Sequence, residues 1–165
     1  NGIPSFNNGF GHLIGSLASL PDYSLNIYGK HGRSPFTTQP LINNATSVHP
    51  NIHFKGQLRN SSNFYKNNHI YANIGIYNSF DLPTLYSMIN GMVPIISPNL
   101  PISEFLPNYP FISNCDYNEI IKTIKQIKNT SDVDLKDILH KEVNNIKFLN
   151  DNFLKEKYYF FLNSL

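Results

Sequence analysis

Short apolar runs alternate with longer amphipathic stretches along the first two thirds of the chain. The apolar runs contain β-branched or aromatic residues, and most of them end at Gly, Ser or Asn, which is typical of strands. The predicted strands are Ser24–Gly29, Asn51–Gly56, Ile70–Ile76, Val93–Ser97 and Pro110–Ser113.

Between these strands, apolar residues recur three and four positions apart, which is the spacing of an amphipathic helix. The predicted helices are Phe10–Leu20, Ser61–Asn67 and Leu82–Asn90, with a single turn at Glu104–Leu106. Strands that alternate with helices favour right-handed βαβ crossovers and a mostly parallel sheet flanked by helices. The expected fold class is therefore α/β, and ligands of such a sheet bind beyond the carboxyl ends of its strands.

The last third of the chain predicts two further helices. Asp116 can cap the first, and Glu119 three residues later completes a capping box. Ser131 and Asp134 start the second. The inward-facing residues of the two helices are Ile120, Ile121, Ile124, Ile127, Leu135, Ile138, Leu139, Val143 and Ile146. Asn150–Asn152 interrupts the pattern, and packing of the apolar segment Tyr158–Leu165 on the body is favoured over a membrane-surface role.

Composition narrows the function classes. The 165 residues correspond to one domain, and the low charged fraction of 15% with a net charge of +2 argues against a strongly basic nucleic-acid binder. The only cysteine, Cys115, excludes an intramolecular disulfide and a cysteine-based zinc cluster. No apolar run approaches the roughly 20 residues that span a bilayer. A chain that starts at Asn1 without a secretion signal is expected to be a fragment of a cytoplasmic protein, with peripheral membrane association as an alternative.

Two loops that lead into predicted helices are candidate anion sites. Around Gly9, glycine allows close approach of the backbone, and helix N–H groups favour phosphate. Before Leu82, the loop Tyr77–Asp81 offers Ser79 and backbone amides, with Asp81 as a helix cap. For both loops, the alternative is an ordinary turn before a helix.

The remaining candidates are weaker. Lys30 and Arg33 follow a predicted strand and could meet an anionic ligand, although solvated loop residues are slightly favoured. His49 and His53 have a zinc-like spacing but flank a proline, so no metal site is expected. Neither a Ser/His/Asp arrangement nor a closely spaced acid pair of the glycosidase kind is identified.

The order of these segments resembles the C-terminal, nucleotide-sugar-binding lobe of GT-B glycosyltransferases of the group 1, family-4-like class. The resemblance covers nearly the whole chain, and its best segment is Asn78–Ser97. That segment is similar to the family stretch E-G-F-G-L-x-x-x-E-A-M-A-x-G-x-P-V-V-A-S, with one extra residue before the proline. The matching residues are Phe80, Leu82, Met88, Gly91, Pro94 and Ser97. The resemblance implies a Rossmann-like lobe over residues 1–165, with a separate N-terminal lobe outside this chain.

The resemblance also implies a donor site, but the charged contacts of the family are missing. Its two glutamates fall on Asn78 and Tyr86, and its arginine and lysine fall on about Ile3 and on Asn8. All four positions are neutral here, so a bound diphosphate loses charge-assisted hydrogen bonds. The expected donor-binding residues are Asn8, Gly9, Lys30, Arg33, Asn78, Ser79, Phe80, Asp81, Leu82 and Tyr86.

Three readings of function follow. The first is a glycosyltransferase that moves a sugar from a nucleotide sugar to a glycan or protein acceptor, using no cofactor or metal and inactive without its N-terminal lobe. The second is a degenerate, non-catalytic lobe that binds a partner or a glycan, which the neutral residues favour. The third is an unrelated doubly wound nucleotide-binding domain. The first is narrowly preferred, and the catalytic residues are not identifiable from the sequence.

Overall fold

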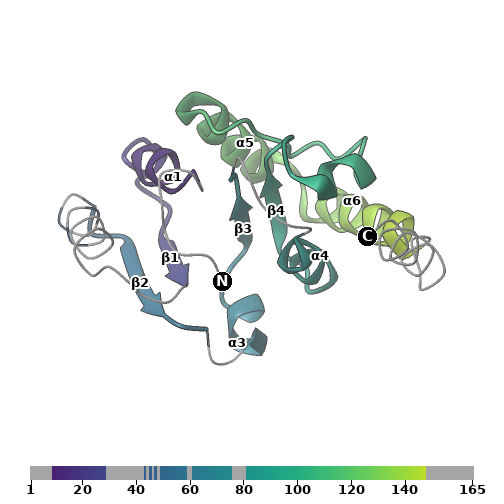
Figure 1. Cartoon of the computed structure of the whole chain (residues 1–165), viewed down its shortest axis with the longest axis horizontal. Coiled ribbons are helices and arrows are strands. Elements are labelled where there is room, and N and C mark those ends of the chain that lie inside the picture. Colours follow the sequence, from purple (N-terminus) through teal and green to yellow (C-terminus); the bar gives the residue numbers. More distant parts are fainter. Residues whose placement is uncertain are drawn as a thin grey trace, which may run out of the picture.

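The computed structural model describes residues 9–28, 43, 45, 47, 49–58, 61–75 and 81–147 (Figure 1). Helices and strands alternate along this part of the chain, which confirms the α/β prediction. The elements are α1 (Phe10–Leu17), β1 (Leu25–Tyr28), β2 (Ile52–Gly56), α3 (Ser61–Lys66), β3 (Ile70–Asn73), α4 (Leu82–Ile89), β4 (Val93–Ile96), the 3₁₀ helix η2 (Pro101–Phe105), α5 (Tyr117–Asn129) and α6 (Asp132–Lys147).

The described strands pair in parallel, as predicted, but they form two separate pairs instead of one sheet. β1 pairs with β2 from Leu25 opposite Ile52, and β3 pairs with β4 from Ile70 opposite Val93. Within the described residues β1 and β3 do not pair, and both strands line the same cavity. The strand expected at 110–113 is reduced to one bridge from Ile112 to β4.

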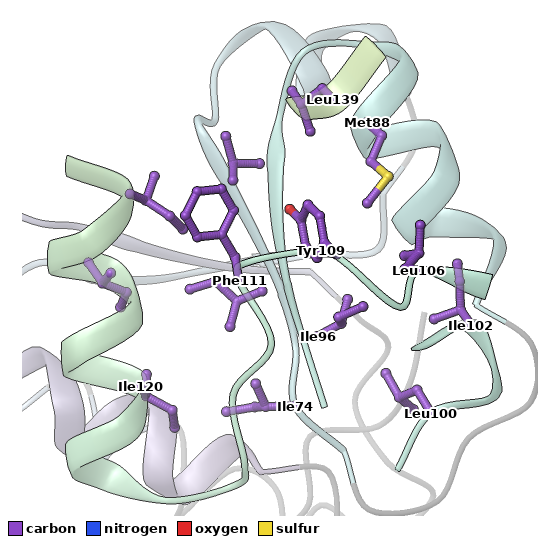
Figure 2. Packing of buried hydrophobic residues seen from close by; sticks show 14 of the residues in the cluster. Ile74, Met88, Ile96, Leu100, Ile102, Leu106, Tyr109, Phe111, Ile120 and Leu139 are labelled. Carbon is purple, nitrogen blue, oxygen red and sulfur yellow. The ribbon is translucent and has the colours of Figure 1, made fainter. Parts of the chain in front are cut away.

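Strand β4 lies at the centre of the larger hydrophobic core. All four of its residues are buried, as expected for a continuous apolar run. In Figure 2, Ile120 of α5 and Met88 of α4 lie on different sides of this core, which also includes Leu139 of α6. A smaller cluster contains Phe10, Leu17, Ile27, Ala45 and Ile52, so α1 packs over the first strand pair.

Tyr109 connects the segment before α5 to β4. Its hydroxyl donates a hydrogen bond to the Pro94 carbonyl at 2.6 Å, and its ring meets Phe111 edge-on at a centroid distance of 5.5 Å. Burial raises the pKa of the Tyr109 hydroxyl well above its ordinary value, with a smaller contribution from the charge of Glu142. The hydroxyl therefore stays protonated and remains a donor.

The two C-terminal helices begin where the sequence predicts. Asp116 caps α5 by accepting from the N–H groups of Asn118 and Glu119. The second half of the expected capping box is wrong, because the Glu119 carboxylate accepts from the backbone and side-chain N–H groups of Asn114. In α6, the Ser131 hydroxyl accepts from the Asp134 N–H at 3.2 Å. The apolar residues predicted to face inward on both helices belong to the larger core or pack on it.

Helix α4 ends at a glycine, as the sequence predicts. Gly91 has a φ of +80°, and the Gly91 and Met92 N–H groups bond to the Met88 and Ser87 carbonyls. This pair of hydrogen bonds is the Schellman motif, which needs a left-handed residue after the helix. The motif turns the chain directly into β4.

We expect Tyr109→Phe to lower the free energy of unfolding by about 1 kcal/mol, because the substitution removes one buried hydrogen bond but keeps the ring. Urea unfolding of the purified chain measures this loss. Tyr86→Phe is the matched control, since 54% of Tyr86 is exposed. Equal unfolding midpoints for both variants and the wild type would show that the bond to Pro94 adds nothing.

Candidate functional site

The best-defined polar cluster lies at the start of α4 and is centred on Asp81. Asp81 is only 8% exposed, and its carboxylate accepts hydrogen bonds from the Asn73 amide at 2.6 Å and the Tyr71 hydroxyl at 3.4 Å. It also accepts from the hydroxyl of Thr84. Tyr71 and Asn73 alternate along β3, so both can face the same carboxylate. β3 therefore supplies two of the three donors.

The predicted capping role of Asp81 is only half right. Asp81 occupies the N-cap position of α4, but its side chain makes no hydrogen bond to a backbone N–H of the helix. The side-chain donors of Tyr71, Asn73 and Thr84 hold the carboxylate instead. The carboxylate thus joins the helix start to β3.

The donors to Asp81 are all neutral. Lys128 with Asp22 is the salt bridge found in the described ranges, and it does not involve Asp81. Burial and then the charge of Asp81 raise the pKa of Tyr71 far above its ordinary value. Burial, Tyr86 and Asp81 raise the pKa of Tyr65 in that order. Burial is the largest cause for both tyrosines and the charge of Asp81 adds to it, while no described Lys or Arg forms a salt bridge with Asp81.

The start of α4 offers few free backbone donors. Pro83 has no N–H, and the Thr84 N–H already bonds to the Asp81 carbonyl at 3.1 Å. In the first turn of α4, this leaves the N–H of Leu82 as the backbone donor for a ligand. The side chains of Leu82 and Tyr86 are 53% and 54% exposed, so these two predicted site residues lie on the outer face of α4.

The start of α1 is different. Gly9 occupies its N-cap with a φ of +70°, no side chain caps the helix, and its first turn contains no acidic residue. His12, which the sequence places beside this loop, is exposed. The first-turn N–H groups of an α-helix have no partners within the helix, and they carry the positive end of its dipole. The start of α1 is therefore compatible with an anion.

Gly9 packs against the end of β3. A Cβ at Gly9 would lie 2.7 Å from Ile74 Cγ1, 2.8 Å from the Ile74 carbonyl oxygen and 2.9 Å from Cys115 Sγ. Because Ile74 directly follows Asn73, the structure brings Gly9 and Asp81 to the same end of β3. A strand end of this kind is where ligands of parallel sheets bind.

A cavity of about 1540 Å³ runs along the whole of β3, including this end. Its lining includes Phe10 of α1, Tyr28 of β1, Tyr71 and Asn73 of β3, and Asp81. Tyr28 also meets Phe64 of α3 edge-on, with ring centroids 5.0 Å apart. Aromatic rings and side-chain amides thus share the lining with three carboxylates and three lysines, which are Asp22, Asp81, Asp132, Lys66, Lys128 and Lys136.

Four of the predicted site residues can be placed: Gly9 and Asp81 lie at the same end of β3, whereas Leu82 and Tyr86 lie on the exposed face of α4. The others, namely Asn8, Lys30, Arg33, Asn78, Ser79 and Phe80, lie outside the described residues. Sequence reasoning missed Tyr71, Asn73 and Thr84. The alternation of Tyr71 and Asn73 in a strand that leads to Asp81 was the available signal.

The described ranges contain no group of three or more His, Cys, Asp or Glu side chains that could hold a metal ion. They also contain no helix with the length and apolar character needed to cross a membrane.

Comparison with solved structures identifies the fold. HepE from Anabaena in complex with UDP and glucose has a TM-score of 0.80 and 12% identity, and the match covers 99% of this chain and 47% of that chain. Sucrose-phosphate synthase from Thermosynechococcus elongatus has a TM-score of 0.75 and 15% identity, over 98% of this chain and 44% of that chain. The C-terminal domain of a group 1 glycosyl transferase, LpcC from Francisella tularensis, has a TM-score of 0.70 and 15% identity, over 90% and 82%.

These matches define the class of fold. The chain has the Rossmann-like fold of the C-terminal lobe of GT-B glycosyltransferases, as the sequence resemblance predicts. It spans about half the length of the HepE and sucrose-phosphate synthase chains. No family model matches the sequence, and no curated protein does either.

The two left-handed glycines provide a test of the contact at Gly9. Gly91→Ala meets no atom within 4 Å, so we expect only the backbone cost of about 1–2 kcal/mol. Gly9→Ala has the same backbone cost and also collides with Ile74, which adds about 1–3 kcal/mol. Urea unfolding of both variants measures the difference. Equal losses for the two variants would contradict the close contact between Gly9 and β3.

Proposed function

We propose that this chain is the donor-binding lobe of a glycosyltransferase that transfers a sugar from a nucleotide sugar to a glycan or protein acceptor. The observation that carries the proposal is the anion-compatible start of α1, which lies at the end of β3 in a lobe of GT-B fold. Solved structures of HepE with this fold hold UDP and UDP-glucose, which supports a nucleotide sugar as the ligand class.

The proposed roles follow the chemistry of each group. Uncapped amides of α1 hold a phosphate, because N–H donors and the helix dipole both favour negative charge. Tyr86 lies near the nucleoside, and Asn78 contacts the donor sugar. The other proposed donor contacts are Asn8, Lys30, Arg33, Ser79, Phe80 and Leu82. Neither a cofactor nor a metal is required.

Catalysis in this proposal is mostly positioning, together with stabilisation of the departing diphosphate. The acceptor site and the remaining catalytic groups belong to an N-terminal lobe. The chain alone is therefore expected to bind donor without transferring sugar. We place the protein in the cytoplasm, where nucleotide sugars are available to a bacterial-type enzyme.

A second function is favoured by one observation. Asp81 holds a buried carboxylate at a helix start with no salt-bridge partner in the part of the chain that the structure describes, and the positions that match the family's four charged residues are neutral. A lobe with these features could have lost donor binding and serve as the glycan- or partner-binding subunit of another transferase. The presence or absence of nucleotide binding separates the two functions.

We expect thermal unfolding to detect the donor. UDP, GDP and ADP and their sugar conjugates are titrated against the chain and against the longer protein with both lobes. A nucleotide at about 100 times its dissociation constant stabilises by about 2.7 kcal/mol, which is about 5–10 °C for a domain of this size. No shift with any nucleotide in either protein would contradict the donor site and favour the non-catalytic lobe.

The role of α1 has its own matched pair of variants. His12→Asp places a carboxylate in the first turn of α1, and we expect it to weaken binding of the preferred nucleotide about three- to ten-fold by repelling phosphate. Ala18→Asp adds the same charge at the exposed opposite end of α1 and should change affinity less than about two-fold. Isothermal titration calorimetry measures both. Equal effects would show that phosphate binds elsewhere.

A further inference from the structure

We infer that Asp81 is a specificity-determining residue of the donor site: its buried negative charge keeps phosphate groups away from the start of α4 and directs them to the start of α1. This inference rests on the proposed function. It concerns the binding of the donor's phosphates, and it assigns Asp81 the opposite role from a phosphate contact.

The geometry around Asp81 excludes the carboxylate as a direct partner for phosphate. A carboxylate is an acceptor, and a phosphate oxygen is also an acceptor, so no hydrogen bond can join the two. The carboxylate is fixed by the Asn73 amide at 2.6 Å, with Tyr71 and Thr84 as its other donors. It is therefore held at the end of β3.

The backbone of α4 cannot compensate for this charge. Pro83 removes one first-turn donor, and the bond from the Thr84 N–H to the Asp81 carbonyl occupies another. The positive end of the α4 dipole already faces its own carboxylate at Asp81. A phosphate at this helix start would meet more negative charge than free N–H donors.

Burial makes the charge effective over several ångströms. Asp81 is 8% exposed and no described Lys or Arg pairs with it, so water and counterions screen it weakly. Burial is the main reason that the pKa values of Tyr71 and Tyr65 are raised, and the charge of Asp81 raises both further, so the carboxylate lies close to side chains of both β3 and α3.

The start of α1 is the better anion site at the same end of β3. It has no side-chain cap and no acidic residue in its first turn. Cys115, which packs beside Gly9, is followed directly by a described acid, Asp116. Because Asp116 is exposed, solvent screens its charge more strongly than that of Asp81. Its carboxylate also accepts from two N–H groups of α5.

The test is Asp81→Asn, measured by calorimetry with UDP, inorganic pyrophosphate and uridine. The amide has the shape of the carboxylate and can still hydrogen-bond with Asn73 and the two hydroxyls, so we expect the midpoint of thermal unfolding to change by less than about 3 °C. Removing the charge should tighten UDP about ten-fold. Uridine, which has no phosphate, should bind with unchanged affinity.

Asp137→Asn is the matched control. Asp137 is exposed on α6 and is absent from the cavity lining, so the same loss of charge there should change UDP affinity less than about two-fold. The gain in UDP affinity from Asp81→Asn should also shrink as NaCl is raised from about 50 to about 500 mM, because salt screens the interaction between two charges.

The outcomes separate this inference from the proposed function. Wild-type protein that binds UDP, with Asp81→Asn unchanged or weaker, overturns the inference and leaves the donor site in place. A gain for uridine equal to that for UDP also overturns it, because the effect would then not act on phosphate. If neither protein binds UDP or pyrophosphate, the donor site and the inference both fail. Binding of UDP by the variant alone supports the inference and identifies Asp81 as the cause of lost donor affinity.

Discussion

The complete burial of β4 is the constraint on which most of the described structure depends. A parallel strand buried on both faces must have partners on both faces, and here α4, α5 and α6 supply much of this cover. β3 pairs along β4, so the position of β4 also fixes where β3 ends. The end of β3 then determines where Gly9 lies, against Ile74, and where Asp81 lies, bonded to Asn73. The candidate site is thus a consequence of the core.

Backbone chemistry at the two helix starts separates two sites that look alike in sequence. Both loops lead from a Gly- or Asn-rich segment into an eight-residue helix. One start has a left-handed glycine and uncapped amides, whereas the other has a proline, an occupied N–H and a buried carboxylate. A helix start favours an anion only while its donors and its positive potential remain available. The start of α1 therefore favours an anion, whereas the start of α4 does not.

The close approach at Gly9 also changes the meaning of a glycine before a helix. Glycine at such a position is often explained by the approach of a ligand to the backbone. At Gly9 the space is already taken by Ile74 and Cys115, so the glycine is needed for packing whether or not a ligand binds. The contact joins α1 to the second strand pair, and α1 also lies beside α5 (Figure 1).

The sequence by itself determined the order of the elements, because strand runs and amphipathic periodicity are local properties. It also determined the cap at Asp116, the turn at Gly91 and the resemblance to a GT-B lobe, which the fold comparison confirms. Only the tertiary structure decided where the side chains of Glu119 and Asp81 bond. Glu119 reaches Asn114, and Asp81 reaches Tyr71 and Asn73, because polar groups choose partners by distance in space and not along the chain. The same reason made Tyr71, Asn73 and Thr84 invisible as site residues until β3 and α4 were placed side by side.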